Sequence, residues 1–234
     1  MAWQLNVNTG NSDGKATKTP QGPFLFPSGA FAVMYGPGPT LVSSTTETSL
    51  LTGATGTTIT QPSSGVLTNL GLPQNGPYPA SSLILPGNIQ GGMGMGSLAL
   101  GTLFYFNFLG TIANTGTPNF TLKLGLVHQG TGTFTAIATI PATAMVTTTA
   151  VLLEIQGSFI VVTGGSSGEI DGQIEMDYLP SSAATNVVSL NSPYGALSSF
   201  DLTQTYALDI RATWGTSSAS NTTTVKYGVF ELVG

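Results

Sequence analysis

Four carboxylates of equal parity recur along one short segment of the chain. They are Glu169, Asp171, Glu175 and Asp177. In an extended strand they would point to one face, with neighbours roughly 6.5–7 Å apart. At that spacing they could hold a divalent cation only if a neighbouring strand or subunit added ligands. The alternative, which we favour, is a solvated face that prevents wrong pairing of an edge strand.

Catalytic and metal-binding residues are scarce. The chain has one histidine, His128, and no cysteine. A Ser-His-Asp system requires three groups in contact, and the sequence lacks the GxSxG elbow that presents such a serine. A zinc site needs more histidines or cysteines, and the run GGMGMG at 91–96 lacks the GK[ST] ending of a phosphate-binding loop. We predict no enzymatic activity, no catalytic residue, no metal and no cofactor.

Other polar and aromatic side chains have both a structural and a binding interpretation. Asp209 and Arg211 share parity on one predicted strand, which indicates an ordinary ion pair at the surface or in an interface. Trp3, Tyr194 and Trp214 carry rings that could stack on sugars. Trp214, however, follows the inward parity of its strand, which favours the core.

Composition excludes two classes of partner. Only 6% of the 234 residues are charged, against about 25% in an average soluble protein. Five Lys plus Arg and a net charge of -5 leave no basic stripe, so we predict no nucleic-acid partner. No run of ~18 apolar residues occurs and the N-terminus lacks the pattern of a signal peptide, so we expect no membrane partner. A surface this poor in charge is typical of one that neighbouring subunits cover.

The strongest strand signal runs from Leu98 to His128. Residues at even positions on both sides of a turn at 114–118 form one apolar wall, while residues at odd positions are less hydrophobic. The turn contains Asn, Gly and Pro, which are typical turn residues. We interpret the segment as a β-hairpin whose apolar face needs a second sheet to cover it.

Further segments alternate in the same way. We expect strands at 41–52, 57–60, 133–140 (closed by Pro141), 150–163, 169–179, 203–214 and 222–233, with a connection at 180–201. The inward residues include Phe104, Phe106, Leu122, Leu124, Ile174, Leu208 and Ile210. About eight long strands and no helical period predict an all-β fold, an eight-stranded antiparallel jelly-roll sandwich.

Two regions differ from this pattern. Residues 1–42 are rich in Gly, Pro and aromatic residues and are predicted to be an extended N-terminal arm, because proline disfavours a compact sheet. The arm packs either on its own domain or on a neighbouring subunit. The candidate docking residues for the capsid or a subunit are Phe24, Phe26, Phe31, Met34 and Tyr35. Residues 43–234 form the predicted jelly-roll domain, with a long loop insertion at about 61–97.

The segments TETSLLTG, GTLFYFNFLGTIANTGTPNFTLKLGLV, LLEIQGSFIVVTGGSSGEIDGQIEM and QTYALDIRATWGTSSASNTTTVKYGVFELV, in this order, resemble jelly-roll virion structural proteins of tailed bacteriophages. Two turns carry the likeness most clearly, namely G-x-I-x-N-T-G-T-P at 110–118 and W-x-T-S-S-A-S-N-T at 214–222. The resemblance covers about residues 43–234, apart from 61–97. This family has no catalytic residues that could be assigned to positions of this chain.

This resemblance implies a structural role. The expected function is that of a non-enzymatic capsid decoration (cement) protein on the exterior of a phage head. The expected partners are other copies of the chain, as a homotrimer, and the major capsid protein or another virion protein. Two alternatives remain open: a carbohydrate-binding tail or fibre module that contacts the host surface, and a single jelly-roll capsid protein.

Overall fold

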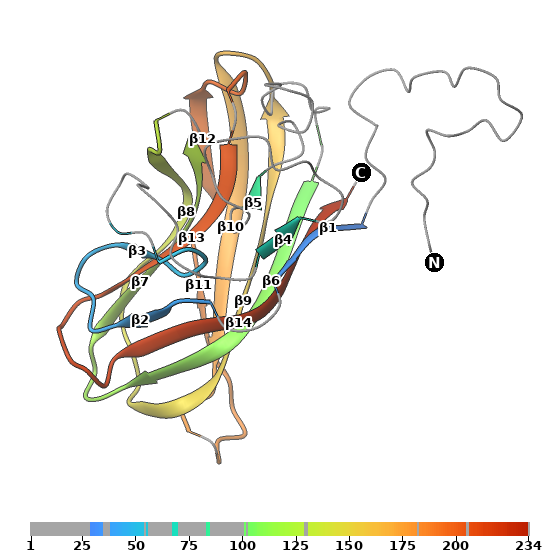
Figure 1. Cartoon of the computed structure of the whole chain (residues 1–234). Coiled ribbons are helices and arrows are strands. Elements are labelled where there is room, and N and C mark those ends of the chain that lie inside the picture. Colours follow the sequence, from blue (N-terminus) through green and yellow to red (C-terminus); the bar gives the residue numbers. More distant parts are fainter. Residues whose placement is uncertain are drawn as a thin grey trace, which may run out of the picture.

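All regular elements of the described structure are β-strands (Figure 1). The computed structural model describes residues 29–34, 38–53, 55, 67–69, 83–84, 101, 103–128, 131–181, 183–204 and 206–233. Across these ranges the chain forms antiparallel sheets, and it contains no helix long and apolar enough to cross a membrane. The all-β prediction is confirmed.

The larger sheet has nine strands in the described part of the chain. Its main path is β11 (Val188–Asn191), β10 (Gly168–Tyr178), β9 (Thr148–Thr163), β6 (Leu103–Asn114), β14 (Thr222–Val233), β1 (Gly29–Met34) and β4 (Leu67–Asn69). Off this path, β12 (Gly195–Phe200) pairs with β10 and β2 (Thr40–Val42) pairs with β14. The long strand β14 therefore has β2 beside its first residues and β1 beside its last ones.

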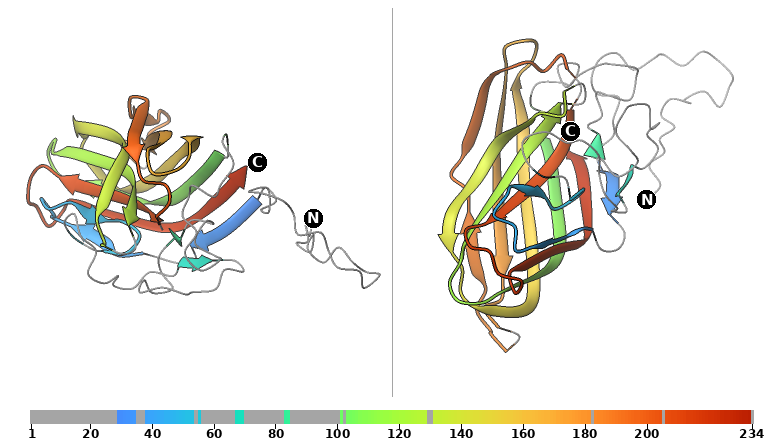
Figure 2. Two further views of the ribbon diagram at one scale, coloured as in Figure 1. Left: turned by 90° about the horizontal axis from the view of Figure 1, so that it is seen from above. Right: turned by 60° about the vertical axis from the view of Figure 1, so that its left-hand side comes forward.

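The smaller sheet has five described strands. Their path is β3 (Thr48–Ser49), β13 (Tyr206–Trp214), β7 (Asn119–His128) and β8 (Phe134–Ala144), and β5 (Leu83–Ile84) also pairs with β13. The two sheets curl around a shared interior, as the views in Figure 2 show. The arrangement is a curled β-sandwich.

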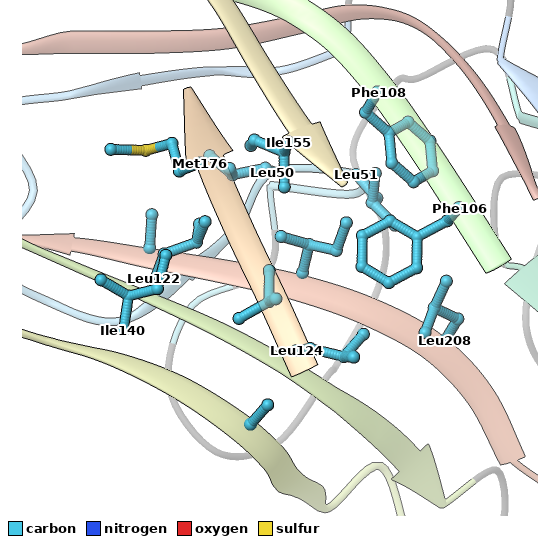
Figure 3. Close-up of a cluster of buried hydrophobic side chains, with 14 of the residues drawn as sticks. Leu50, Leu51, Phe106, Phe108, Leu122, Leu124, Ile140, Ile155, Met176 and Leu208 are labelled. Carbon is cyan, nitrogen blue, oxygen red and sulfur yellow. The ribbon is translucent and has the colours of Figure 1, made fainter. Parts of the chain in front are cut away.

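The core lies between the two sheets. Side chains from β6, β9 and β10 meet those from β7, β8 and β13 there (Figure 3). The predicted inward residues Phe104, Phe106, Leu122, Leu124, Ile174, Leu208 and Ile210 are all buried. Stacked rings of Phe104, Phe159 and Phe230 join three strands of the larger sheet at this interior. The alternation of the sequence therefore identified the core correctly.

The predicted hairpin of residues 98–128 is wrong in its pairing. Its two strands exist as β6 and β7, but β6 pairs with β9 and β14 whereas β7 pairs with β8 and β13. The turn between them carries the chain from one sheet to the other. The two apolar walls face each other across the sandwich, which covers both without a further layer.

Three other predicted boundaries also change. The strand predicted at 41–52 is split into β2 and β3, which belong to different sheets, and Ser43 between them has a positive φ of 55°. Pro141 does not close its strand, because it lies where the register of edge strand β8 shifts, a position that tolerates a missing N–H. The connection at 180–201 contains β11 and β12. The strand predicted at 57–60 lies outside the described residues.

Part of the predicted arm belongs to the larger sheet. β1 and β2, at 29–34 and 40–42, pair with β14, so strands occur where proline content predicted none. Within the predicted loop at 61–97, β4 pairs with β1 and β5 pairs with β13. The short strands of this region extend the two sheets, and for residues 29–34 and 40–42 this corresponds to the alternative in which the arm packs on its own domain.

A close approach at Gly228 provides a test of this packing. A Cβ atom at Gly228 would lie 1.9 Å from Cδ1 of the buried Phe108. We expect Gly228→Ala to lower the free energy of unfolding by about 1–3 kcal/mol through overpacking. Urea denaturation measures this change. The exposed neighbour Tyr227 supplies the control, because Tyr227→Thr should change stability by less than about 0.5 kcal/mol. Equal effects of the two substitutions would contradict the described packing.

Candidate functional site

The outward face of the larger sheet carries a chain of hydrogen-bonded polar side chains. The Tyr105 hydroxyl of β6 donates to Oε1 of Gln156 on β9 over 3.1 Å, and Nε2 of Gln156 donates to Oε2 of Glu175 on β10 over 3.2 Å. On the same face, Nδ2 of Asn107 donates to Oε1 of Glu154 over 2.6 Å. These bonds run across the strands, so the sheet fixes the side chains relative to one another.

A hollow of about 230 Å³ lies on this face. Its lining spans four neighbouring strands and the residue after β11. The residues are Tyr105, Gln156, Gly157, Ser158, Gln173, Ile174, Glu175, Asn191 and Ser192. Ser192 is fixed to β10, because its backbone N–H donates to the carbonyl of Ile174 and its hydroxyl accepts from the N–H of Ile174. Nothing in the sequence pattern indicated the hollow, because its residues come from segments far apart in the chain.

The predicted acidic row lies along β10 on this outward face, and its members interact mainly with neutral side chains. Glu175 accepts from Gln156, and Asp171 accepts from the hydroxyl of the exposed Tyr194. The hydrogen bond to Asp171 is the main reason that the pKa of Tyr194 is raised. Asp177 lies opposite Glu154 in the β9–β10 register. No group of three or more His, Cys, Asp or Glu suited to a metal ion occurs among the described residues.

The ion pair predicted for the surface or an interface is buried within the chain. Asp209 and Arg211 are 1% and 0% exposed, and Nε of Arg211 lies 2.8 Å from Oδ2 of Asp209. The Ser49 hydroxyl donates to Oδ1 of Asp209 over 2.5 Å, which ties the β3 segment to β13. Parity placed the two residues on the same face of β13, but the surface assignment is wrong because other parts of the chain cover that face.

Phe134 and Glu47 help to enclose Arg211. The guanidinium carbon lies 4.2 Å from the centre of the Phe134 ring, and Nη1 lies 3.5 Å from Oε1 of Glu47. Glu47 also accepts from Lys123 on β7. Burial raises the pKa of Asp209, while the Arg211 charge and the Ser49 hydrogen bond act in the opposite direction. The network is structural, since its central groups have no access to solvent.

His128 is held at the end of β7. Its Nδ1 accepts from the N–H of Thr131 over 3.0 Å, and its ring meets the edge of Tyr206. Burial, reinforced by the charge of Asp201, raises the pKa of Tyr206 to about 12. Hydrogen bonds from the hydroxyl and the N–H of Thr203 lower the pKa of Asp201. This arrangement is a hydrogen-bonded turn.

The two turns that carry the virion-protein resemblance meet at one end of the sandwich. The N–H of Thr115 donates to Oδ1 of the buried Asn221 over 3.3 Å. The N–H of Gly215 donates to the carbonyl of Asn119 over 2.7 Å, and the N–H of Ser43 donates to the carbonyl of Asn221. Asn221 therefore joins three connections between strands, which gives these motifs a structural role.

The predicted docking residues are only partly within the described chain. Phe31 and Met34 lie in β1, between β14 and β4, whereas Phe24, Phe26 and Tyr35 lie outside the described residues. Of the candidate sugar-stacking rings, Trp214 is buried against Phe120, and Tyr194 is 69% exposed. Trp3 also lies outside the described residues. Of the two rings that the structure describes, Tyr194 is the accessible one.

Chemically, the described residues are suited to recognition. The Tyr105–Gln156–Glu175 chain presents fixed donors and acceptors on an accessible face. The charged pair of β13 is enclosed, and His128 is engaged with the turn that follows it. The candidate site is therefore the hollow on the larger sheet.

Substitutions in the buried pair test its structural role. We expect Asp209→Ala to lower the free energy of unfolding by about 3–5 kcal/mol, because the charge of Arg211 would lose its closest partner. We also expect Arg211→Met to lower the free energy of unfolding. The double variant Asp209→Ala/Arg211→Met should lose less of this free energy than the two single variants added together, with a coupling energy of about 0.5–3 kcal/mol. Urea unfolding of the wild type, the two single variants and the double variant gives both the loss of stability and the coupling energy.

The pair of Lys123 and Glu47 serves as the control, because Lys123 retains 32% side-chain exposure. Lys123→Ala should cost at most about 1 kcal/mol. Additive effects at Asp209 and Arg211 would show that the two charges do not depend on each other.

The chain has no significant match among protein-family models, curated proteins or solved structures. Function must therefore be inferred from the sheets, the turns and the hollow themselves, together with the sequence resemblance.

Proposed function

We propose that this protein is a non-enzymatic structural component of a phage virion. More specifically, we propose a decoration (cement) protein with a jelly-roll fold that lies on the capsid exterior. It would assemble as a homotrimer and contact the major capsid protein or another virion protein. Neither a cofactor nor a nucleic acid enters this role.

The main support is the order in which strands pair. β7 pairs with β8, β6 with β9, β3 with β13 and β2 with β14, so that each pair encloses the previous one along the chain. The pairs β14–β6 and β13–β7 then complete the central paths of the two sheets. Folding one long antiparallel ribbon over on itself produces this nested order, and such a ribbon is the basis of a jelly roll. β10, β11 and β12 extend the sheet beyond β9.

The joined turns provide a second line of support. Both motifs that resemble the virion family lie at the same end of the sandwich, and buried Asn221 links them. The link gives both motifs a role in holding the fold together, which agrees with a structural protein. Phe31 and Met34 lie in β1 of the larger sheet, so the segment available as an anchoring arm is residues 1–28.

The surface also supports assembly. Leu109, Leu152 and Tyr227 are 38%, 55% and 59% exposed on the larger sheet. Leu109 lies opposite Tyr227 in the β6–β14 register, so two of these apolar side chains are neighbours. With 6% charged residues, the chain is suited to extensive contact with other subunits.

Location in the particle tests the proposed role. Antibodies raised against the recombinant chain should place immunogold label regularly over the heads of purified source particles. Label confined to the tail or its fibres would favour the carbohydrate-binding alternative. Shells built from this chain without another main shell subunit would favour the single jelly-roll capsid protein, and particles without label would overturn all three.

Removal of residues 1–28 tests the arm. This truncation keeps β1 and β2, so we expect a folded trimer that no longer binds capsid shells. Light scattering measures the assembly mass, and co-sedimentation with undecorated shells measures binding. Phe24→Ser with Phe26→Ser should reproduce the binding loss, whereas Gln21→Ala should not. Full occupancy by the truncated protein would contradict the arm as anchor, and a monomeric full-length chain would contradict the trimer.

A further inference from the structure

The hollow on the larger sheet has the chemistry of a site for a polyhydroxylated ligand. Three of its side chains, Gln156, Gln173 and Asn191, are amides, each of which offers both N–H donors and a carbonyl acceptor. Ser158 and Ser192 add hydroxyl groups. Sugar hydroxyls also donate and accept, so paired amide groups can satisfy them in both directions.

The central amide is held in place before any ligand arrives. The Tyr105 hydroxyl donates to the carbonyl of Gln156, and its amide nitrogen donates to Glu175. These two hydrogen bonds use one carbonyl lone pair and one N–H of Gln156. The second N–H and the second lone pair are left for a ligand. A side chain fixed in this way loses little conformational entropy when a ligand binds.

Charge and size narrow the class of ligand. Among the described residues of the lining, Glu175 is the only charged one, and Glu154 and Asp177 lie opposite each other on the same face. These carboxylates disfavour phosphates and acidic sugars, since like charges repel. The volume of about 230 Å³ is below the roughly 300–1,000 Å³ of sites for drug-sized ligands. It therefore suits a single sugar ring.

We propose that this hollow binds the end of a neutral glycan. Gln156, Gln173, Asn191 and Glu175 would bind hydroxyl groups, and the ring of Tyr105 would contact the apolar face of a sugar. The exposed Tyr194 follows Ser192 by two residues, and its hydroxyl bond to Asp171 holds the ring beside β10. The Tyr194 ring therefore offers a second stacking surface for the next sugar of the glycan. The binding does not depend on where the protein lies in a particle.

Saturation-transfer NMR on the full-length protein tests this site. The probes are methyl glycosides of glucose, galactose and mannose together with N-acetylglucosamine, and the anionic comparators are N-acetylneuraminic acid and glucose 6-phosphate. We expect transfer to at least one neutral sugar at millimolar concentration and weaker transfer to both anions. Competition titrations then give the dissociation constant.

Matched substitutions separate the hollow from the rest of the face. Gln156→Ala and Gln173→Ala should each raise the dissociation constant at least tenfold, and Gln173 is exposed, so its replacement should leave the fold intact. Val162→Thr, on the same sheet but outside the lining, should leave binding unchanged.

Three results would overturn the glycan site: no transfer to any neutral sugar of the panel, equal binding of the anions, or equal losses in Val162→Thr and the two glutamine variants. Each leaves the immunogold result for the virion role unaffected.

Discussion

The structure depends on two apolar walls that bury each other. Phe104 and Phe106 of β6 face Leu122 and Leu124 of β7 across the sandwich, and all four are buried. The chain has no cysteine, so no disulfide can replace this burial, which contributes about 25 cal/mol for each Å² of apolar surface removed from water. The polar features of the molecule, including the hollow and the joined turns, are positioned by strands that this contact holds together.

Alternation in the sequence predicted which residues point inward, because the side-chain period of a strand is fixed by its backbone. It could not predict how strands pair, since β6 and β7 have the same pattern whether they lie in one sheet or two. The odd or even spacing of two residues also predicts only that they lie on the same face of a strand, and does not predict whether that face is covered. Asp209 and Arg211 share a face, but coverage of that face by Phe134 and the β3 segment arises from distant parts of the chain.

The candidate site was less predictable for the same reason. The acidic row of β10 is visible in the sequence, yet its use depends on Gln156 of β9 and Tyr105 of β6, which only the sheet brings beside Glu175. The turn motifs at 110–118 and 214–222 were visible, because turns need particular residues locally. Their contact through Asn221 was not, because it joins segments about a hundred residues apart.

The nested strand order has a consequence for how the chain folds. The innermost pair, β7 and β8, joins neighbouring segments, whereas β14 pairs with β2 and β1 and so joins Val42 to Thr222 and Gly29 to Leu232. Closing a longer loop costs more chain entropy, and folds dominated by such distant pairings form in milliseconds to seconds. Assembly from the centre outward would leave the pairing of β14 with β2 and β1 until last. During synthesis, the strand at Val42 must then wait until the ribosome has added the strand at Thr222.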